Sequence, residues 1–287
     1  MTQIQDSVIQ AGHYVTVENV RIHYQEYGAE HAGKQPPVLL LHGWPTSSFL
    51  WRNVAPHIAQ AGRRVIAIDL PGFGLSDKPL DEVYSFRFYS KIIDGFLKQI
   101  DVPGPIALTV HDLGGPVGVY WACANPDRVE RLALLNTLVY PEMSWAVKLF
   151  FLALRLPFAK SWITSQSGLR FAMRLGVGDP GGLAPDTIPG TQEPFQSPEA
   201  RAALLKAGGE LSIKGFFIMS QRLGKLKMPA RMIYGTADRI LPDVADTAQR
   251  LKGDLPQLEI TELPGCGHFL QEDRPDEVGR LLADFFG

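Results

Sequence analysis

The chain has 287 residues, of which 45% are apolar and 10% aromatic, and its formal net charge at pH 7 is −2. A chain of this length and composition buries a large core, which excludes an intrinsically disordered protein. Basic residues are scattered along the sequence, so we expect no nucleic-acid partner. The two cysteines, Cys123 and Cys266, are too few for a disulfide framework, and we expect both to be reduced thiols.

The sequence gives no indication of export or of a membrane span. Its first ten residues are polar and lack the basic start and apolar stretch of a secretory signal, so we expect a cytoplasmic protein. The most apolar region, residues 145–163, contains four residues that disfavour a spanning helix. These are Lys148, Arg155, Pro157 and Lys160. We therefore expect no membrane partner, and the oligomeric state stays open.

Short apolar segments alternate with helical stretches along the first half of the chain. Near-continuous apolar runs of this kind predict parallel strands that are covered on both faces. The predicted strands are 38–41, 64–68, 106–110 and 132–135, and the pattern returns at 231–234 and 258–261 before a last helix at about 275–286. We therefore expect an α/β fold with a mostly parallel central sheet flanked by helices.

Residues 140–225 interrupt this alternation. They contain apolar helical segments, then a glycine- and proline-rich loop over 176–198, then further short helices. Long loops without regular structure are usually lids or binding loops, and open α/β sheets bind ligands beyond the carboxyl ends of their strands. We predict a helical cap domain over 140–225, inserted into a core domain formed by 1–139 and 226–287.

Residues 110–116, VHDLGGP, lie between a predicted buried strand and an apolar helix. The glycines allow a sharp turn, and the proline suits the first turn of the helix. This is the position at which α/β hydrolases place a nucleophile, usually serine, and here it holds Asp112. A helix N-cap is the alternative role for such an aspartate.

A carboxylate at this position changes the chemistry. An ionised carboxylate displaces a leaving group from saturated carbon without a general base, and the product is an alkyl ester on the enzyme. Water must then attack the ester carbonyl, which requires a base and two hydrogen-bond donors for the oxyanion.

Two residues near the C-terminus supply the other catalytic groups. His268 lies on a glycine-rich loop after the last predicted strand, and Asp238 follows the strand before it. The order nucleophile, acid, base is the order that the fold requires. We predict a triad in which Asp112 attacks, His268 activates water, and Asp238 orients His268 and stabilises its cationic form.

Three further motifs resemble those of haloalkane dehalogenases and epoxide hydrolases, and the resemblance covers nearly the whole core. They are LHGWPTSSFLWR at 41–52, DLPGFGLSDKP at 69–79 and GHFLQED at 267–273. The resemblance implies the α/β-hydrolase fold and an oxyanion hole formed by the backbone N–H groups of Trp44 and Leu113, and it implies no cofactor or metal. Some dehalogenases place a glutamate where this chain has Asn136, which leaves Asp238 as the acid.

The leaving group divides this family. A halide needs N–H donors, whereas an opening epoxide needs a proton, which cap tyrosines usually supply. Between Pro141 and Ile233 the chain has no tyrosine or histidine. This favours the halide, although Leu113 stands where dehalogenases carry a halide-binding tryptophan.

Three tryptophans are candidates for binding the leaving group. Trp44 occupies the position of a halide-binding asparagine in many dehalogenases, and Trp162 lies in the predicted cap, with Trp145 as its rival. Indole N–H groups donate to an anion but do not readily protonate one. Packing within the cap is the alternative role for Trp162, and the Trp44–Pro45 pair is also common in epoxide hydrolases.

The sequence therefore favours a hydrolase that uses water on a small apolar substrate and resembles a haloalkane dehalogenase. The first alternative is an epoxide hydrolase in which tryptophans replace the cap tyrosines. The second is changed, cofactor-free chemistry or ligand binding on the same scaffold.

Overall fold

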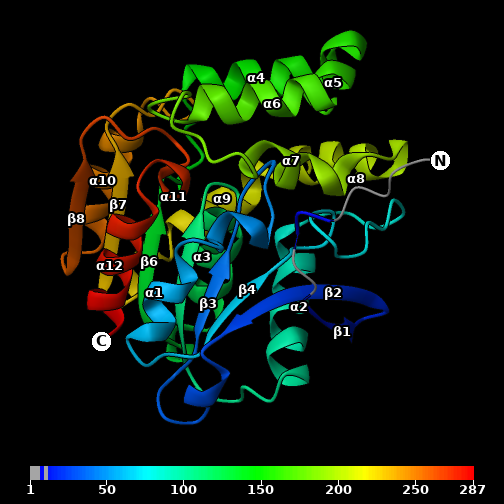
Figure 1. Cartoon of the computed structure of the whole chain (residues 1–287). Coiled ribbons are helices and arrows are strands. Elements are labelled where there is room, and N and C mark those ends of the chain that lie inside the picture. The colour runs from blue at the N-terminus through cyan, green and yellow to red at the C-terminus, as the bar shows by residue number, and fades with distance from the viewer. Residues whose placement is uncertain (1–6, 10–11) are drawn as a thin grey trace.

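The computed structural model describes residues 7–9 and 12–287, so most of the polar N-terminal segment lies outside the described residues. Within them, an eight-stranded sheet runs through the protein in the order β1-β2-β4-β3-β5-β6-β7-β8 (Figure 1). Strands β3 to β8 are parallel, and β1 and β2 add an antiparallel hairpin beside β4. The strands are His13–Val17, Val20–Tyr27, Val38–Leu41, Val65–Ile68, Ile106–His111, Val129–Leu135, Ala230–Gly235 and Leu258–Leu263.

The six strands predicted from apolar runs are confirmed to within a few residues. The sequence does not predict the hairpin of β1 and β2. Strand β1 is mostly exposed, and β2 is mostly buried in its first half but only partly buried in its second half. A pattern of that kind lacks the continuous apolar run of a strand covered on both faces. The expected mostly parallel sheet is therefore correct, with an antiparallel edge added.

Successive strand residues point to opposite faces of the sheet, and each face has its own core. Leu39 and Leu41 of β3 pack with helices α2 and α3, whereas Val38 and Leu40 pack with α1 and α12. The core helices are α1 Ala55–Gln60, α2 Phe86–Gln99, α3 Gly114–Ala124, α10 Val244–Asp254, α11 Leu270–Asp273 and α12 Pro275–Phe286. Three short 3-10 helices, η1 Ala29–His31, η2 Ser48–Trp51 and η3 Pro126–Arg128, lie in the loops. The predicted last helix is confirmed by α12.

Between β6 and β7 the chain forms a group of helices that lies over the carboxyl ends of the strands (Figure 1). These are α4 Trp145–Arg155, α5 Pro157–Ile163, α6 Gln166–Gly176, α7 Thr187–Gln192, η4 Glu193–Phe195, α8 Pro198–Gly209, α9 Ile213–Ser220 and η5 Leu223–Lys225. Helices α4, α6, α8 and α9 each begin after a serine whose hydroxyl accepts a backbone N–H bond, which caps the helix. We call α4 to α8 the cap helices. Their status as a separate domain over 140–225 stays a prediction, and α9 packs against core helix α3.

The expectation of an irregular loop over residues 176–198 is wrong in its second half, where α7 and η4 form. Tertiary contacts outweigh the glycine and proline content there. The guanidinium of Arg52 donates to Asp186 just before α7 and also to Glu272 of α11, with N–O distances of 2.7–3.1 Å. Thr187 donates to Glu272 at 2.7 Å. This partly buried network connects the cap helices to the core.

Cys123 and Cys266 are buried and unpaired, as expected. In the described part of the chain, no helix combines the length and the apolar character needed to cross a membrane.

Candidate active site

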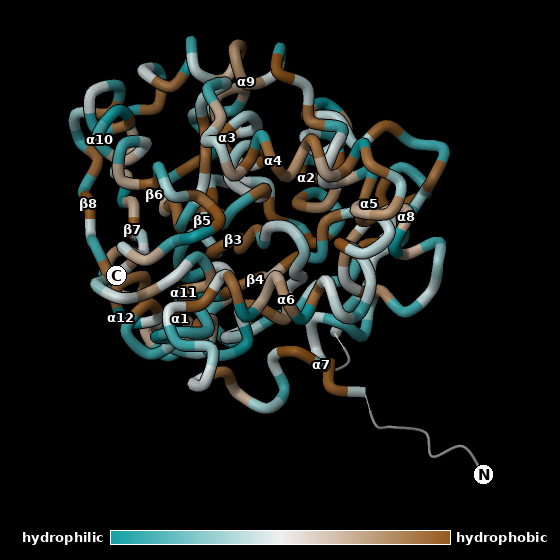
Figure 2. The backbone as a smooth tube through the Cα atoms, turned by 90° about the horizontal axis from the view of Figure 1, so that it is seen from above, coloured by the Kyte–Doolittle hydropathy of each residue, from teal (hydrophilic) through white to brown (hydrophobic). Residues whose placement is uncertain are grey.

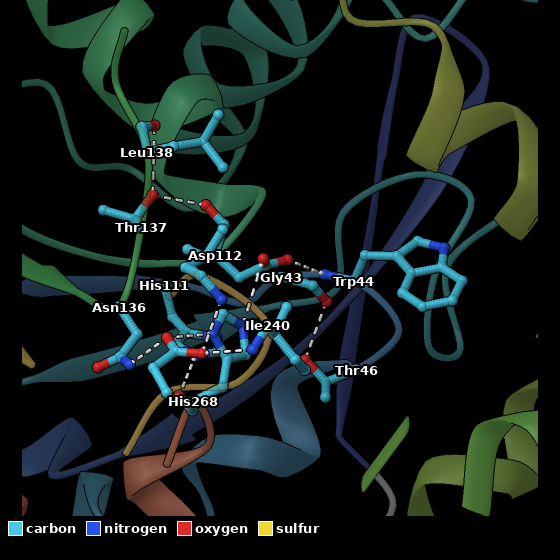
Figure 3. Close-up of polar contacts among 12 residues, drawn as sticks. Gly43, Trp44, Thr46, His111, Asp112, Asn136, Thr137, Leu138, Ile240 and His268 are labelled. Carbon is cyan, nitrogen blue, oxygen red and sulfur yellow. Dashed lines mark hydrogen bonds and ion pairs between the residues drawn. The ribbon is translucent and has the colours of Figure 1, made fainter. Parts of the chain in front are cut away.

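The parallel strands bring four polar side chains together at one edge of the sheet. Asp112 follows β5, Asn136 follows β6, Asp238 follows β7 and His268 follows β8. Figure 3 shows Asp112, Asn136 and His268 converging on one point from these different loops. All four are buried.

The backbone of Asp112 lies in the left-handed region, with φ of +49°. This conformation is uncommon outside glycine, although asparagine and aspartate adopt it more often than other residues, and it is held here by neighbouring contacts. The Thr137 hydroxyl donates to the Asp112 carbonyl oxygen at 2.7 Å, and the Asp112 N–H donates to the Asn136 carbonyl oxygen at 3.2 Å. A Cβ on Gly115 would lie 1.7 Å from the Thr137 hydroxyl oxygen, so this turn requires glycine there.

His268 lies between the two predicted carboxylates. Its Nε2 is 3.3 Å from Oδ2 of Asp112, and its Nδ1 is 2.8 Å from Oδ2 of Asp238. The other oxygen of Asp238, Oδ1, accepts the backbone N–H groups of Ile240 and Leu241, both at 2.8 Å. The structure therefore brings together the three residues that the sequence proposed as a triad.

Asn136 was considered only as an uncharged residue, and its position beside Asp238 was missed. Its side-chain N–H donates to Oδ2 of Asp238 and to the Gly267 carbonyl oxygen, and its Oδ1 accepts the Gly235 N–H at 3.0 Å. Asn136 thus connects the ends of β6 and β7 to the loop that carries His268. The sequence does indicate this position in one way, because Asn136 directly follows a buried strand, as Asp112 does.

The electrostatics of the three groups are strongly coupled. Burial alone lowers the pKa of His268, but Asp238 and Asp112 outweigh it and raise the pKa to about 10. Burial alone raises the pKa values of both aspartates, but His268 and hydrogen-bond donors outweigh it, so both values lie below the usual one. These shifts favour a histidinium between two carboxylates at neutral pH.

Backbone N–H groups face the Asp112 carboxylate. The Trp44 N–H donates to Oδ1 at 2.7 Å, and the Leu113 N–H helps to lower the pKa of the carboxyl group. A Cβ on Gly43 would lie 2.3 Å from the Asp112 Cβ, so only glycine allows this close approach. The two N–H groups predicted for the oxyanion hole are therefore positioned at the carboxylate.

The loop that presents Trp44 is held by a buried network. Asp69, at the end of β4, accepts the Ser48 N–H at 2.6 Å and the Leu75 N–H at 2.7 Å, and lies 2.8 Å from Nδ1 of His23. Burial alone raises the pKa of Asp69, but His23 and the donors outweigh it and lower the pKa to about 2. An ionised Asp69 thus connects the first two motifs of the resemblance.

The loop of His268 is held in a similar way. Asp273 accepts the backbone N–H groups of Gly267 at 2.7 Å and of Gly178, in the segment after α6, at 2.9 Å. His111, whose pKa is lowered to about 3 by burial and by His268, lies with Nε2 3.0 Å from the His268 carbonyl oxygen. The neutral ring of His111 donates this bond and has a structural role.

A cavity of about 860 Å³ lies between the cap helices and the strand ends, with Asp112 and Leu113 in its wall. Its ionisable lining residues among those described are Asp112, Asp238 and Arg239, and the others are mostly apolar. Arg239 is exposed, and its role at the cavity was not predicted. A lining of this composition favours a small apolar ligand.

The three tryptophans differ in what their indoles contact, although all line the cavity. The Trp44 indole N–H donates to the Leu204 carbonyl oxygen of α8 at 3.1 Å, and Figure 3 shows its ring turned away from Asp112. The role of this side chain in binding the leaving group stays a prediction, and it has less support than that of the other two because its donor is occupied. Trp145 and Trp162 make no hydrogen bond through their indoles to any residue that the structure describes, so both stay candidates.

Among residues 7–9 and 12–287, no group of three or more His, Cys, Asp or Glu side chains is arranged to hold a metal ion.

Residues 36–275 match the model of the alpha/beta hydrolase fold family, which covers most of the chain. A haloalkane dehalogenase from Sphingobium indicum is 30% identical over 291 residues, covering 88% of this chain and 89% of that protein. The uncharacterized hydrolase YugF of Bacillus subtilis is 27% identical over 94% of this chain and 96% of its own. The crystal structure of the haloalkane dehalogenase DbeA from Bradyrhizobium elkani superposes with a TM-score of 0.83 at 25% identity, covering 96% of each chain.

The chain is thus a hydrolase with the α/β-hydrolase fold. Within that fold family it belongs to the haloalkane dehalogenase-like group, as the sequence motifs indicated.

The contribution of Asp112 to the pKa of His268 can be tested by mutation. The change Asp112→Asn removes one of the two anions that stabilise the histidinium, so the pKa of His268 should fall from about 10 towards its ordinary value. NMR titration of the imidazole signals between pH 5 and 11 would measure this shift. The change Asp284→Asn, which removes an exposed charge on α12, serves as the matched control. An unchanged His268 titration in Asp112→Asn would contradict the coupling.

Proposed function

We propose that this hydrolase cleaves a carbon–halogen bond in a small apolar substrate through a covalent ester on Asp112. The observation that carries the proposal is that the two carboxylate oxygens have different partners. Oδ1 accepts the Trp44 N–H, whereas Oδ2 lies 3.3 Å from His268. A backbone donor is thus already in place for the oxygen that becomes an oxyanion.

In the first step, Oδ2 attacks the substrate carbon and a C–O bond forms. The carbon–halogen bond breaks, and the halide leaves with the bonding electron pair. The lowered pKa of Asp112 keeps the nucleophile ionised at neutral pH, so no base is needed. The mostly apolar lining of the cavity lowers the local polarity around the carboxylate, which strengthens the attack by a charged group.

Formation of the ester changes the state of His268. The carboxylate becomes a neutral ester, so one of the anions that raise the pKa of His268 disappears and the imidazolium more readily loses its proton to solvent. The neutral imidazole then accepts a proton from water as the water oxygen attacks the ester carbonyl. Asp238 stabilises the new histidinium, and the tetrahedral intermediate collapses to the alcohol and the free carboxylate.

The halide requires a donor in the cap. The Trp162 indole lines the cavity, its ring packs 5.4 Å from Phe171, and its N–H is unoccupied among the described contacts. No tyrosine or histidine is among the described lining residues, so the donors suit an anion better than an alkoxide that needs a proton. This favours halide over epoxide, and Trp162 over the occupied indole of Trp44.

Replacing His268 should separate the two steps. In His268→Gln the ester should form but should not hydrolyse, because no base activates water. Intact-mass spectrometry after incubation with 1-bromobutane should show an adduct that maps to the peptide containing Asp112. The double variant Asp112→Asn, His268→Gln should show none. If several brominated substrates turned over by the unmodified enzyme left His268→Gln without an adduct, the covalent mechanism would be wrong.

Halide binding should depend on Trp162. Bromide should quench the intrinsic fluorescence saturably, and Trp162→Phe should weaken bromide binding by about tenfold to a hundredfold, because one hydrogen bond to an anion contributes about 1.5–3 kcal/mol. Trp44→Phe is the matched control and should bind bromide normally, since its indole N–H already bonds to Leu204. An enzyme that shows no saturable bromide effect but converts styrene oxide to its diol would favour the epoxide alternative instead.

A further inference from the structure

The outer side of the cap is unusually apolar. Helices α4 and α5 contain no buried residue, although their sequences are rich in leucine and aromatic side chains. Leu152 and Leu156 are 54% and 52% exposed, and Phe158 is 92% exposed. Val147 and Phe150, on the other side of α4, line the cavity. A helix that is apolar on both sides is normally covered on both sides.

The segment that forms this surface contains exposed cations without acidic partners. Residues 143–178 contain no aspartate or glutamate, although the whole chain has a formal net charge of −2. The basic residues in this segment are all exposed, and they are Lys148, Arg155, Lys160, Arg170 and Arg174. None of them forms an ion pair with a carboxylate among the described residues. We call this set, with Leu152, Leu156 and Phe158, the outer cap face.

Two of the cations line a cavity of their own. Arg170 and Arg174 are one turn apart on α6, and with Gln166, Ser167 and Phe171 they border a hollow of about 460 Å³. Guanidinium groups bind phosphate oxygens in bidentate fashion, and the neighbouring polar side chains add further donors. Phe171 lines this hollow and also the active-site cavity. The hollow therefore suits a phosphate headgroup beside an apolar region.

The outer cap face is continuous with the active-site cavity. Trp145, Leu149 and Trp162 are 48–69% exposed, and the same side chains form part of the cavity wall. Figure 1 shows α4, α5 and α6 as the elements furthest from the sheet, and Figure 2 shows them lying across the molecule as seen from above. An apolar molecule at this surface would reach the cavity without crossing a polar rim on this side.

We propose that the outer cap face docks on the surface of a bilayer that contains anionic lipids, from which apolar substrate enters the cavity. Exposed aromatic and leucine side chains with basic residues and no acidic ones are typical of helices that lie in the membrane interface. A second copy of the chain fits less well, because two-fold pairing of this face would oppose like charges. This proposal departs from the expectation of no membrane partner, which was drawn from the lack of a spanning helix; docking on the surface needs no such helix.

This inference goes beyond the proposed hydrolysis, and its test requires no turnover. The full chain is floated with vesicles of phosphatidylcholine alone or with about one-third phosphatidylglycerol, at low and high salt. The chain should bind the anionic vesicles, and high salt should weaken binding. Arg170→Gln with Arg174→Gln should weaken binding about tenfold to 30-fold, since each cation near an anionic surface contributes on the order of tenfold or less. Leu152→Gln with Phe158→Gln should also weaken it at least about tenfold.

Matched controls separate this surface from general effects of charge and polarity. Lys91→Gln with Lys98→Gln removes two exposed cations from α2, and Leu80→Gln with Val83→Gln removes two exposed apolar side chains outside the cap. Both controls should bind as the unmodified chain does. Light scattering at the same concentrations reports pairing of copies. Absence of binding to anionic vesicles, equal weakening by the controls, or a dimer that the Leu152 and Phe158 changes dissolve would overturn the proposal.

Discussion

The carboxylate of Asp112 is ionised in the wall of a cavity that is otherwise almost entirely apolar, and the surrounding structure is arranged to support that charge. A buried anion without partners would be protonated instead. Here the Trp44 N–H and the ring of His268 face the two oxygens, and Asp238, on the other side of the ring, stabilises the positive charge of the imidazolium. Bringing the carboxylate to these partners requires a left-handed backbone conformation at Asp112, which is unfavourable for a residue other than glycine.

Core and cap contribute differently to the proposed chemistry. The core fixes the reacting groups through strand ends and through the carboxylates of Asp69 and Asp273, which accept backbone N–H groups of the flanking loops. The cap supplies most of the apolar wall and the remaining indole donors. In the proposed mechanism, variation in the cap helices would therefore change substrate preference, whereas the proposed triad and oxyanion donors depend on the sheet. The hydrogen bonds of Arg52 to Asp186 and Glu272 connect the cap helices to the core.

The sequence predicted the parallel strands and the meeting of Asp112, Asp238 and His268, because buried strands have continuous apolar runs and parallel strands end at one edge. It missed what depends on tertiary contacts. Helix α7 forms in a glycine- and proline-rich stretch next to Arg52, and the β1–β2 hairpin lacks a continuous apolar run. The Trp44 bond to Leu204 has no local pattern in the sequence, and the contact of Asn136 with Asp238 is indicated only by the positions of both residues after neighbouring strands. The cytoplasmic location and the domain boundaries stay predictions.

The central claim is that Asp112 forms an ester whose carbonyl is attacked by water, and isotope labelling tests it most directly. In water enriched in ¹⁸O, a single turnover with enzyme in excess should give an alcohol that contains ordinary oxygen, because that oxygen comes from Asp112. The label should appear in the carboxylate of the peptide that contains Asp112, as measured by mass spectrometry. An alcohol labelled in its first turnover, with no label in this peptide, would mean that water attacks the substrate directly and would contradict the account.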